Sequence, residues 1–238
     1  MKKILLLFIF IITCHLLSNA QVQTIVRRSH RIDETSVVQD SAGNRYAYAD
    51  WQKLMRTGNY TLKSIKPGND STAYLLVKLD EASKSKLIQI MPKPAETTYF
   101  TTGQKLELFS ANDIEGFKLR PKELAGKTLV LNFWFIDCPP CRQEIPELNK
   151  MALSYANDPN IIFIAVALDY KSDLKKFVKE NPFAYHIVEY GRHIADDYGI
   201  RSYPTNVVVD KQGVVRFHAT GFGLNTPYWI KKTIDEVK

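Results

Sequence analysis

The sequence predicts an α/β fold with a mixed central sheet and flanking helices, preceded by a small α+β region. One observation behind this prediction is the segment 128–136, which is apolar except for Asn132 and is typical of a central strand covered on both faces. Another is the alternation of strand-like and helix-like segments that follows it. The third is the last part of the chain, where two strand-like segments flank the turn 210–213 and a helical segment follows.

Residues 1–20 carry the three-part pattern of a secretory signal peptide. Lys2 and Lys3 form a basic start, and residues 4–12 form an unbroken apolar run. Ser18-Asn19-Ala20 then places small residues at the two positions that a signal peptidase reads. We therefore expect cleavage after Ala20 and export to the periplasm, within the cell envelope. The mature chain would then hold two cysteines.

Two alternatives for this segment are a membrane anchor and a lipoprotein signal. A spanning helix needs about 20 apolar residues, and Thr13, Cys14 and His15 interrupt this one too early. Lipidation of Cys14 is disfavoured because Thr13 stands where Gly, Ala or Ser is expected. We expect no stable membrane insertion after cleavage.

Residues 21–102 form the predicted α+β region, which begins with a polar, basic lead-in. Alternating and apolar patterns predict strands at 36–39, 60–66 and 73–79 and helices at 49–56 and 81–91. Turn-forming residues separate some of these segments at 40–44 and 67–70. No set of residues with recognisable catalytic chemistry occurs in this region, so its role is unassigned.

Residues 103–238 carry the pattern of the main α/β domain. A hairpin is predicted from 106–109 and 117–119 around a turn at 113–116, followed by a short helix at 121–124. Further strands are expected at 128–136, 160–168, 185–188, 207–209 and 214–218. Helices are expected at 139–155, at 172–180 with Ser172 as N-cap, at 192–198 and from Thr226 onward.

The composition excludes several classes of protein. Of 238 residues, 45% are hydrophobic and 24% are charged, which rules out collagen, coiled coils and wholesale disorder. The three cysteines are too few for a disulfide framework. The net charge is +7, but no basic motif is interleaved with aromatic residues, so no nucleic-acid partner is expected. We attribute the charge to a solvated lysine-rich surface, with an anionic membrane or an acidic partner as the alternative.

Cys138 and Cys141 are separated by two prolines directly after the most apolar strand. If a helix starts there, the spacing allows a disulfide, and the positive end of the helix dipole favours the Cys138 thiolate. Pro139 and Pro140 stiffen the first turn without breaking the helix, because the missing N–H groups would be unpaired anyway. A thiolate is the attacking species in disulfide exchange.

Other uses of this cysteine pair are less favoured. A structural zinc site needs two further ligands, and the remaining histidines are scattered singly. Copper binding by the dithiol and one histidine stays open, whereas a purely structural disulfide over so short a loop stabilises little. We expect redox use, with no cofactor and no metal.

The segment 132–149, with Tyr203-Pro204-Thr205 downstream, resembles the TlpA/ResA-type thioredoxin-like disulfide reductases, which are exported bacterial relatives of thioredoxin. The resemblance covers about 103–238. It implies a thioredoxin fold with an insert between strand and helix, a redox disulfide between Cys138 and Cys141, and a cis Pro204. It also implies that an incoming client peptide binds at Tyr203, Pro204 and Thr205, and that a membrane electron donor restores the dithiol.

The sequence departs from cytosolic thioredoxin near the dithiol. Asp137 replaces a tryptophan, and Asn132 replaces a buried aspartate that assists deprotonation of the second cysteine. Glu144 matches an acidic residue that resembles the active-site glutamate of the exported subfamily. It lies three residues after Cys141, on the same helical face. We expect Glu144 to handle the proton of Cys141; the alternative is a solvated glutamate paired with a nearby Lys or Arg.

These residues predict a mechanism in which Cys138 attacks a client disulfide and Cys141, helped by Glu144, releases the reduced client. Negative charges at Asp137 and Glu144 should raise the pKa of the thiolate, which favours a reductase. The alternatives are a disulfide oxidase or isomerase and a non-enzymatic copper- or haem-handling chaperone. A peroxidase is disfavoured because no Thr-x-x-Cys motif occurs.

Disulfide-bearing envelope proteins are the expected clients. Apocytochrome c, in cytochrome c maturation, is one of several that remain open. The aromatic neighbours Trp134 and Phe135 are expected in the core rather than on a recognition surface.

Overall fold

A computed structural model describes residues 32–65 and 73–238. The predicted signal peptide with Cys14, most of the predicted lead-in and the turn predicted at 67–70 lie outside the described residues. Among those that are described, no helix has the length and apolar character required to cross a membrane. Contacts within the chain define two units, one within 1–48 and 62–76 and the other within 49–61 and 77–238.

A four-stranded sheet lies in the first part of the chain, with the order β2-β1-β4-β3. Strand β1 (Val37–Gln39) pairs parallel with β4 (Ala73–Lys78) and antiparallel with β2 (Arg45–Tyr46). Strand β3 is Tyr60–Ser64, and the helices of this part are α2 (Tyr48–Arg56) and α3 (Glu81–Ile90). The predicted strands and helices are therefore confirmed. Strand β2 was not predicted, because two residues after a turn carry no periodic signal.

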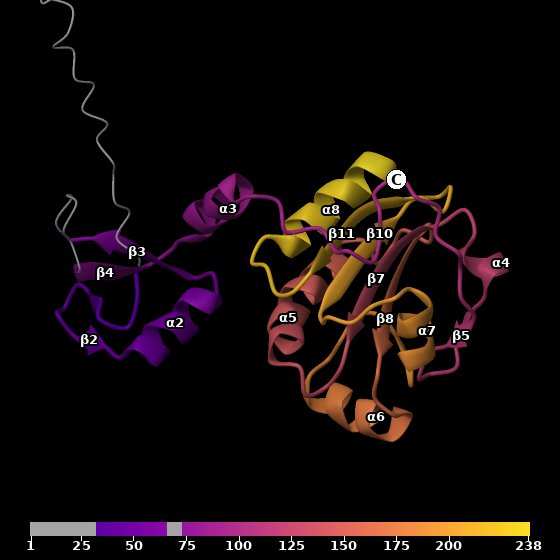
Figure 1. The fold of residues 1–238 in the computed structure, drawn as a ribbon, viewed down its shortest axis with the longest axis horizontal. Helices are drawn as coiled ribbons and strands as arrows, with labels where there is room; N and C mark the ends of the chain where they lie inside the picture. Colours follow the sequence, from indigo (N-terminus) through magenta and orange to yellow (C-terminus); the bar gives the residue numbers. More distant parts are fainter. Residues whose placement is uncertain (1–31, 66–72) are drawn as a thin grey trace, which may run out of the picture. The chain divides into compact units, whose positions relative to one another are not determined.

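A five-stranded mixed sheet forms the centre of the second part, with the order β11-β10-β7-β8-β9 (Figure 1). Its three parallel strands are β7 (Thr128–Trp134), β8 (Ile161–Ala167) and β9 (His186–Val188). Strand β10 (Thr205–Val209) runs antiparallel to β7, and β11 (Val215–Thr220) runs antiparallel to β10. The mixed sheet predicted from the sequence is confirmed.

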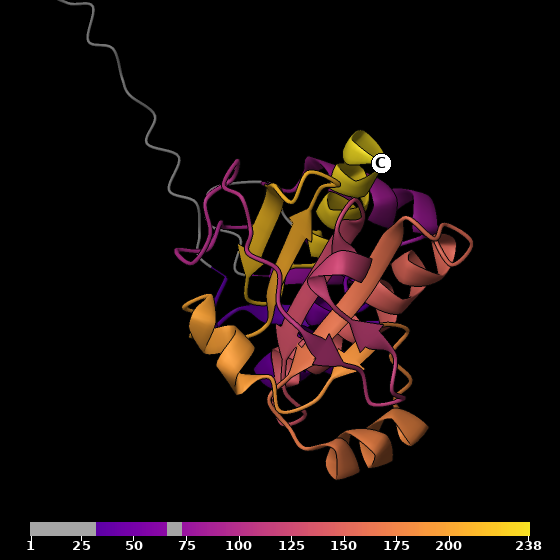
Figure 2. The ribbon, with the colours of Figure 1, turned by 90° about the vertical axis from the view of Figure 1, so that its right-hand side faces the viewer.

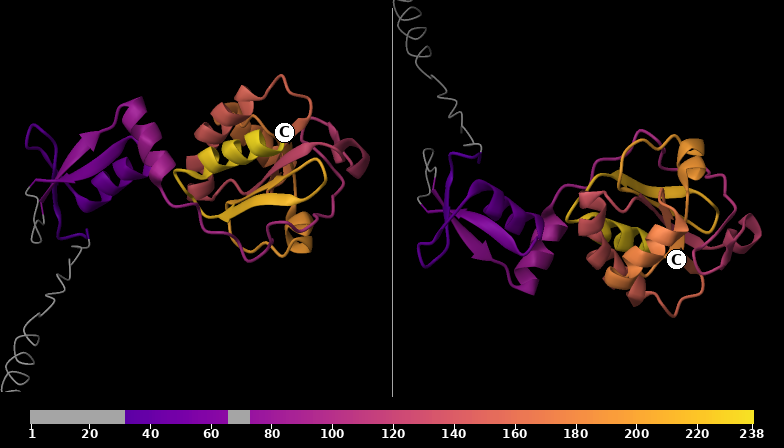
Figure 3. Two further views of the ribbon diagram at one scale, coloured as in Figure 1. Left: turned by 90° about the horizontal axis from the view of Figure 1, so that it is seen from above. Right: turned by 90° about the horizontal axis from the view of Figure 1, so that it is seen from below.

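Helices cover both faces of this sheet (Figure 3). Helices α5 (Pro139–Ser154), α6 (Lys171–Glu180) and α8 (Thr226–Val237) contribute to one buried cluster, and α4 (Pro121–Leu124) and α7 (Arg192–Asp197) to the other. Every residue of β7 is buried. Because side chains alternate along a strand, Val130 and Trp134 enter the α5 cluster, and Leu129, Leu131 and Phe133 enter the α7 cluster.

The hairpin before β7 differs from the prediction (Figure 2). It consists of β5 (Ala111–Asn112) and β6 (Lys118–Leu119), and 106–109 is not a strand. That segment instead lies alongside the turn between β10 and β11, where the Leu106 N–H donates to the Gly213 carbonyl at 2.8 Å. The apolar pattern of 106–109 therefore reflects burial against another part of the chain.

The predicted N-cap of α6 is also wrong. The helix begins at Lys171, and the side chain of the N-cap residue Tyr170 forms no capping hydrogen bond. The Lys171 N–H donates to the Glu189 carboxylate at 3.1 Å, so a neighbouring loop supplies the acceptor that Ser172 was expected to provide.

Candidate active site

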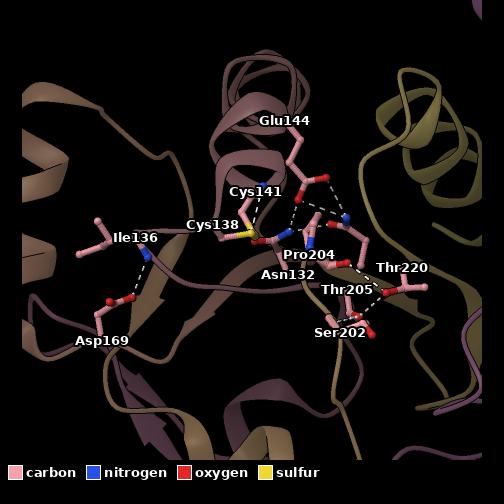
Figure 4. Close-up of a disulfide and its surroundings, with 11 residues drawn as sticks. Asn132, Ile136, Cys138, Cys141, Glu144, Asp169, Ser202, Pro204, Thr205 and Thr220 are labelled. Atoms are coloured by element: carbon pink, nitrogen blue, oxygen red, sulfur yellow. Dashed lines mark hydrogen bonds between the residues drawn. A yellow bond between two sulfur atoms is a disulfide. The ribbon is translucent and has the colours of Figure 1, made fainter. Parts of the chain in front are cut away.

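The two cysteines form a disulfide at the start of α5 (Figure 4). The S–S distance is 2.00 Å and the Cα–Cα distance is 5.3 Å. Cys138 is the N-cap residue, and its sulfur accepts a hydrogen bond from the Cys141 N–H at 3.3 Å. Both cysteines are buried, with 3% and 1% of their surface exposed. The sulfur of Cys138 therefore lies at the positive end of the helix.

The loop between β7 and α5 is held by a contact that the sequence analysis missed. The Ile136 N–H donates to the Asp169 carboxylate at 2.9 Å, and the Cys138 N–H donates to the Phe135 carbonyl at 3.3 Å. Asp169 follows β8, whose carboxyl end lies beside that of β7 because the two strands are parallel. A polar residue just after a buried parallel strand is the sequence signal that points to this edge.

Glu144 lies on α5 one turn after Cys141 and is only 2% exposed. Its Oε1 accepts a hydrogen bond from Asn132 Nδ2 at 2.7 Å, and Asn206 Nδ2 donates to Oε1 at 3.3 Å and to Oε2 at 3.2 Å. Burial raises the pKa of Glu144 to about 8, although the two amide hydrogen bonds oppose the shift.

This burial corrects two expectations about Glu144. The alternative of a solvated glutamate paired with Lys or Arg is wrong, because its partners are two asparagines inside the fold. The expected permanent negative charge is also wrong at neutral pH, because a group with a pKa of about 8 is mostly protonated there. In the disulfide form, Glu144 is therefore a buried acid rather than a fixed charge that opposes the helix dipole.

Asn132 and Asn206 are directly opposite each other on β7 and β10. Asn132 Nδ2 also donates to Asn206 Oδ1 at 2.9 Å. Sequence reasoning noted Asn132 but missed Asn206. The signal was an amide in a strand that continues with three valines. Asn206 directly follows Thr205 and therefore lies on the opposite face of the sheet.

The Tyr203–Pro204 peptide bond is cis, as the family resemblance implied. The Pro204 carbonyl already accepts a hydrogen bond from the Gly221 N–H at 2.8 Å. Within the described parts of the chain, the main-chain N–H and carbonyl of Tyr203 have no such partner. The ring of Tyr203 meets that of Phe135 edge-on at 5.6 Å, next to the loop that leads to the dithiol.

Thr205 and the two aromatic residues after Phe133 have different surroundings. Thr205 is fully buried, and its hydroxyl donates to the Ser202 carbonyl at 2.8 Å, so its side chain closes the turn before β10. Trp134 is in the core as expected, against Phe177 and Phe183. Phe135 is half-buried and lies against Tyr203. Across residues 32–65 and 73–238, no cluster of three or more His, Cys, Asp or Glu could hold a metal ion.

Comparison with known proteins gives consistent similarities. Residues 102–218 match the model of the AhpC/TSA family. The thiol-disulfide oxidoreductase ResA of Halalkalibacterium halodurans is 31% identical over 129 residues, which are 53% of this chain and 73% of that protein. The thioredoxin-like protein YneN of Bacillus subtilis is 31% identical over 116 residues, covering 48% of this chain and 68% of that protein.

A solved structure agrees with these relatives. The putative thiol:disulfide interchange protein DsbE from Chlorobium tepidum superposes with a TM-score of 0.53 at 25% identity, covering 58% of this chain and 98% of that one. The thioredoxin fold expected from the sequence is thereby confirmed. With the disulfide at the start of α5 and the ResA similarity, the chain belongs to the thioredoxin-like thiol-disulfide oxidoreductases of the ResA type.

Proposed function

We propose that this protein is an exported reductase that reduces disulfides of envelope client proteins through Cys138 and Cys141. The observation that carries the proposal is Glu144, a buried acid with a pKa of about 8, one turn after Cys141. A proton-transfer group is most effective when its pKa is close to the operating pH. A cysteine pair that only stabilised the fold would have no use for such a group.

In the first step, the Cys138 thiolate attacks one sulfur of the client disulfide. That bond breaks, a mixed disulfide forms, and the client's other sulfur leaves as a thiolate and takes a proton from solvent. We assign client binding to Tyr203, Pro204 and Thr205. Tyr203 would offer its unpaired main-chain N–H and carbonyl to the client backbone. Pro204 would set the direction of the chain, and the buried Thr205 would hold the turn.

In the second step, Cys141 must lose its proton before it can attack Cys138. Glu144 accepts this proton in its ionised form, which is still populated at neutral pH because its pKa is about 8, and the resulting Cys141 thiolate attacks the Cys138 sulfur. The bond between Cys138 and the client breaks, the Cys138–Cys141 disulfide forms, and the client's sulfur leaves as a thiolate. This thiolate takes a proton from solvent and Glu144 releases the proton it accepted, so the client is fully reduced. Two electrons pass from the protein dithiol to the client, and an upstream membrane electron donor returns them.

The reducing direction rests on the acidic residue next to the dithiol. Asp137 directly precedes Cys138 and disfavours its thiolate. A less stable thiolate makes the dithiol a stronger reductant. The alternative, a disulfide oxidase or isomerase, requires a stabilised thiolate and a strongly oxidising reduction potential of about −120 mV. Measuring the potential against glutathione separates the two directions.

We assign the catalytic role to residues 103–238, which hold the whole five-stranded sheet. The region 21–102 precedes it as a small α+β part without an assigned role. Export rests on the leader pattern of residues 1–20. The proposed enzyme uses no cofactor, because the cysteine pair itself carries the electrons.

Trapping in cells tests the proposal. Cys141→Ser should accumulate clients as mixed disulfides on Cys138, because the second step is blocked. The matched control Cys138→Ser should trap nothing. If Cys141→Ser accumulates no mixed disulfide, the exchange function is wrong. Copper or haem that copurifies with the wild type and is lost in Cys141→Ser would instead support the chaperone alternative.

A further inference from the structure

Two exposed tyrosines lie on loops that are fastened to the active-site loop. Asp169 accepts the Ile136 N–H on its carboxylate at 2.9 Å, and its own carbonyl accepts the Tyr190 N–H at 2.8 Å. Tyr170 follows Asp169 directly. The carboxyl ends of the parallel strands β7, β8 and β9 are thereby joined into one edge, and the dithiol is part of that edge.

The rings of Tyr170 and Tyr190 stack on each other at the protein surface. Their centroids are 5.1 Å apart with an interplanar angle of 14°. The residues are 62% and 55% exposed. Tyrosine is the type of side chain that proteins use at interfaces, because it offers a large rigid surface and a polar tip.

The backbone of Tyr190 is in a conformation that disfavours a bulky residue. Its φ is +46°, and it is the only described residue other than glycine with a positive φ. The next residue fixes this geometry: the Gly191 N–H donates to the Ala167 carbonyl at 2.7 Å, and a Cβ on Gly191 would lie 2.3 Å from Val166 Cγ1. Glycine or asparagine would suit the φ of Tyr190 better. The fold therefore gains no backbone stability from a tyrosine at this position, and more than half of the residue is exposed.

The surroundings of the pair are acidic. Burial raises the pKa of Asp169, and the negative charges of Asp137 and Asp173 raise it further. The three carboxylates therefore lie close to one another. Across 32–65 and 73–238, neither Asp137 nor Asp169 forms an ion pair, whereas Asp173 is 3.7 Å from Lys176. Lys171 and Arg192 begin α6 and α7, and Glu189 directly precedes Tyr190, but the charges that act on Asp169 are both negative.

We propose that the Tyr170–Tyr190 pair docks a lysine or arginine side chain of the client polypeptide, a few residues from the cysteine that Cys138 attacks. The inference rests on the proposed function and names the class of client. A cation is attracted to the face of an aromatic ring, and nearby carboxylates add to the attraction. The pair thereby selects clients whose disulfide lies in a basic segment.

Disulfide-bonded peptides that differ at one position test this directly. The position, three residues after the cysteine, carries Arg, Leu or Glu, and stopped-flow fluorescence follows oxidation of the reduced protein. We expect the Arg peptide to react about fivefold faster than the Leu peptide, a factor typical of an exposed cation–aromatic contact. The Glu peptide should react slowest, and 1 M salt should reduce the advantage of Arg.

Two variants separate docking from folding. Tyr190→Gly removes the ring and suits the positive φ, so it should unfold at the same or a higher denaturant concentration while the Arg advantage falls below about twofold. Tyr170→Ala should lower the Arg advantage in the same way. It should leave α6 intact, because the Tyr170 side chain forms no capping hydrogen bond with this helix. Phe117→Ala is the matched control. Phe117 is 48% exposed and stacks on His186 at 4.3 Å, at the other end of β9.

Each outcome is decisive. Equal rates for the Arg and Leu peptides, or an Arg advantage that survives in Tyr170→Ala and Tyr190→Gly, would overturn the docking proposal. A fall in stability of Tyr190→Gly would also overturn it, by showing that the ring serves the fold. Oxidised glutathione is the probe for the chemistry alone. If wild type reduces glutathione disulfide but shows no Arg preference, only the docking proposal fails; if it reduces neither substrate, the proposed function fails.

Discussion

Glu144 combines burial with hydrogen bonds that favour its charged form. Both asparagine partners donate amide N–H groups to the carboxylate, and burial still raises its pKa to about 8. The effect of burial is therefore larger than that of the hydrogen bonds. Glu144 lies one turn after Cys141 on α5, so a group that titrates close to neutral pH is placed next to the second cysteine.

Replacing Glu144 by glutamine should slow the second exchange step. Glutamine keeps the shape but cannot accept the Cys141 proton, and general bases contribute about 10²–10⁴-fold. Quenched-flow analysis of Glu144→Gln with a disulfide peptide should show normal formation of the mixed disulfide and a release rate lowered by about 10²-fold. An unchanged release rate would remove Glu144 from the mechanism.

The same residue predicts a pH-dependent stability. Folded Glu144 has a pKa of about 8, and its ordinary value is 4.5, so the folded state keeps a proton that the unfolded state releases. The stabilising contribution is present below about pH 4.5 and is lost as the pH rises toward 8. The slope is at most about 1.4 kcal/mol per pH unit.

Urea unfolding of the oxidised protein at pH 5 and pH 8 measures this effect. We expect the wild type to lose more stability than Glu144→Gln between the two pH values, because all other titrating groups are shared. Parallel changes in the two proteins would show that the pKa of Glu144 is not raised.

At the scale of elements, the turn from β9 into α7 is built around a close approach of two chain segments. Gly191 is the N-cap of α7 and lies directly against β8. A Cβ there would be 2.3 Å from Val166 Cγ1 and 3.1 Å from the Ala167 carbonyl oxygen. The same approach fixes Tyr190, so this turn links the packing of β8 to the surface beside the dithiol.

Gly191→Ala should destabilise the fold by about 1–3 kcal/mol, the usual cost of overpacking. The first clash is with Val166, so Val166→Ala should relieve part of it. A double-mutant cycle in denaturant should therefore show that Gly191→Ala costs less in the Val166→Ala background. Additive effects would mean that the carbonyl of Ala167, rather than Val166, limits the space.

At the scale of the whole molecule, the cysteine count and the leader belong together. Removal of the predicted leader 1–20 would take Cys14 away and leave only the active-site pair, with no spare thiol to form a wrong disulfide. An exported redox enzyme benefits from this, because a third thiol could compete with Cys141 for the mixed disulfide.

Mass spectrometry of the protein isolated from the envelope tests this. We expect a mature N-terminus at Gln21, no free thiol in the oxidised protein, and two alkylated cysteines after reduction. A lipid-modified N-terminus at Cys14 would show that the lipoprotein alternative is correct.

Most elements were predictable because their signals are local. The central strand, the helix after Cys138 and the terminal helix follow from periodicity and from Pro and Gly positions. The strand at 106–109 and the Ser172 cap were wrong because long-range contacts decide both: the β10–β11 turn binds Leu106, and Glu189 accepts the Lys171 N–H.

The sequence by itself determined the fold class and the chemistry, because the dithiol after a buried strand and the proline before β10 are local patterns. Only the tertiary structure decided how that chemistry is controlled. It buries Glu144 between α5 and the sheet, brings Asn206 and Asn132 to its carboxylate, and joins Asp169 to the active-site loop. These groups are distant in the chain, and the pKa of an acid depends on the solvent and the dipoles around it rather than on its sequence neighbours.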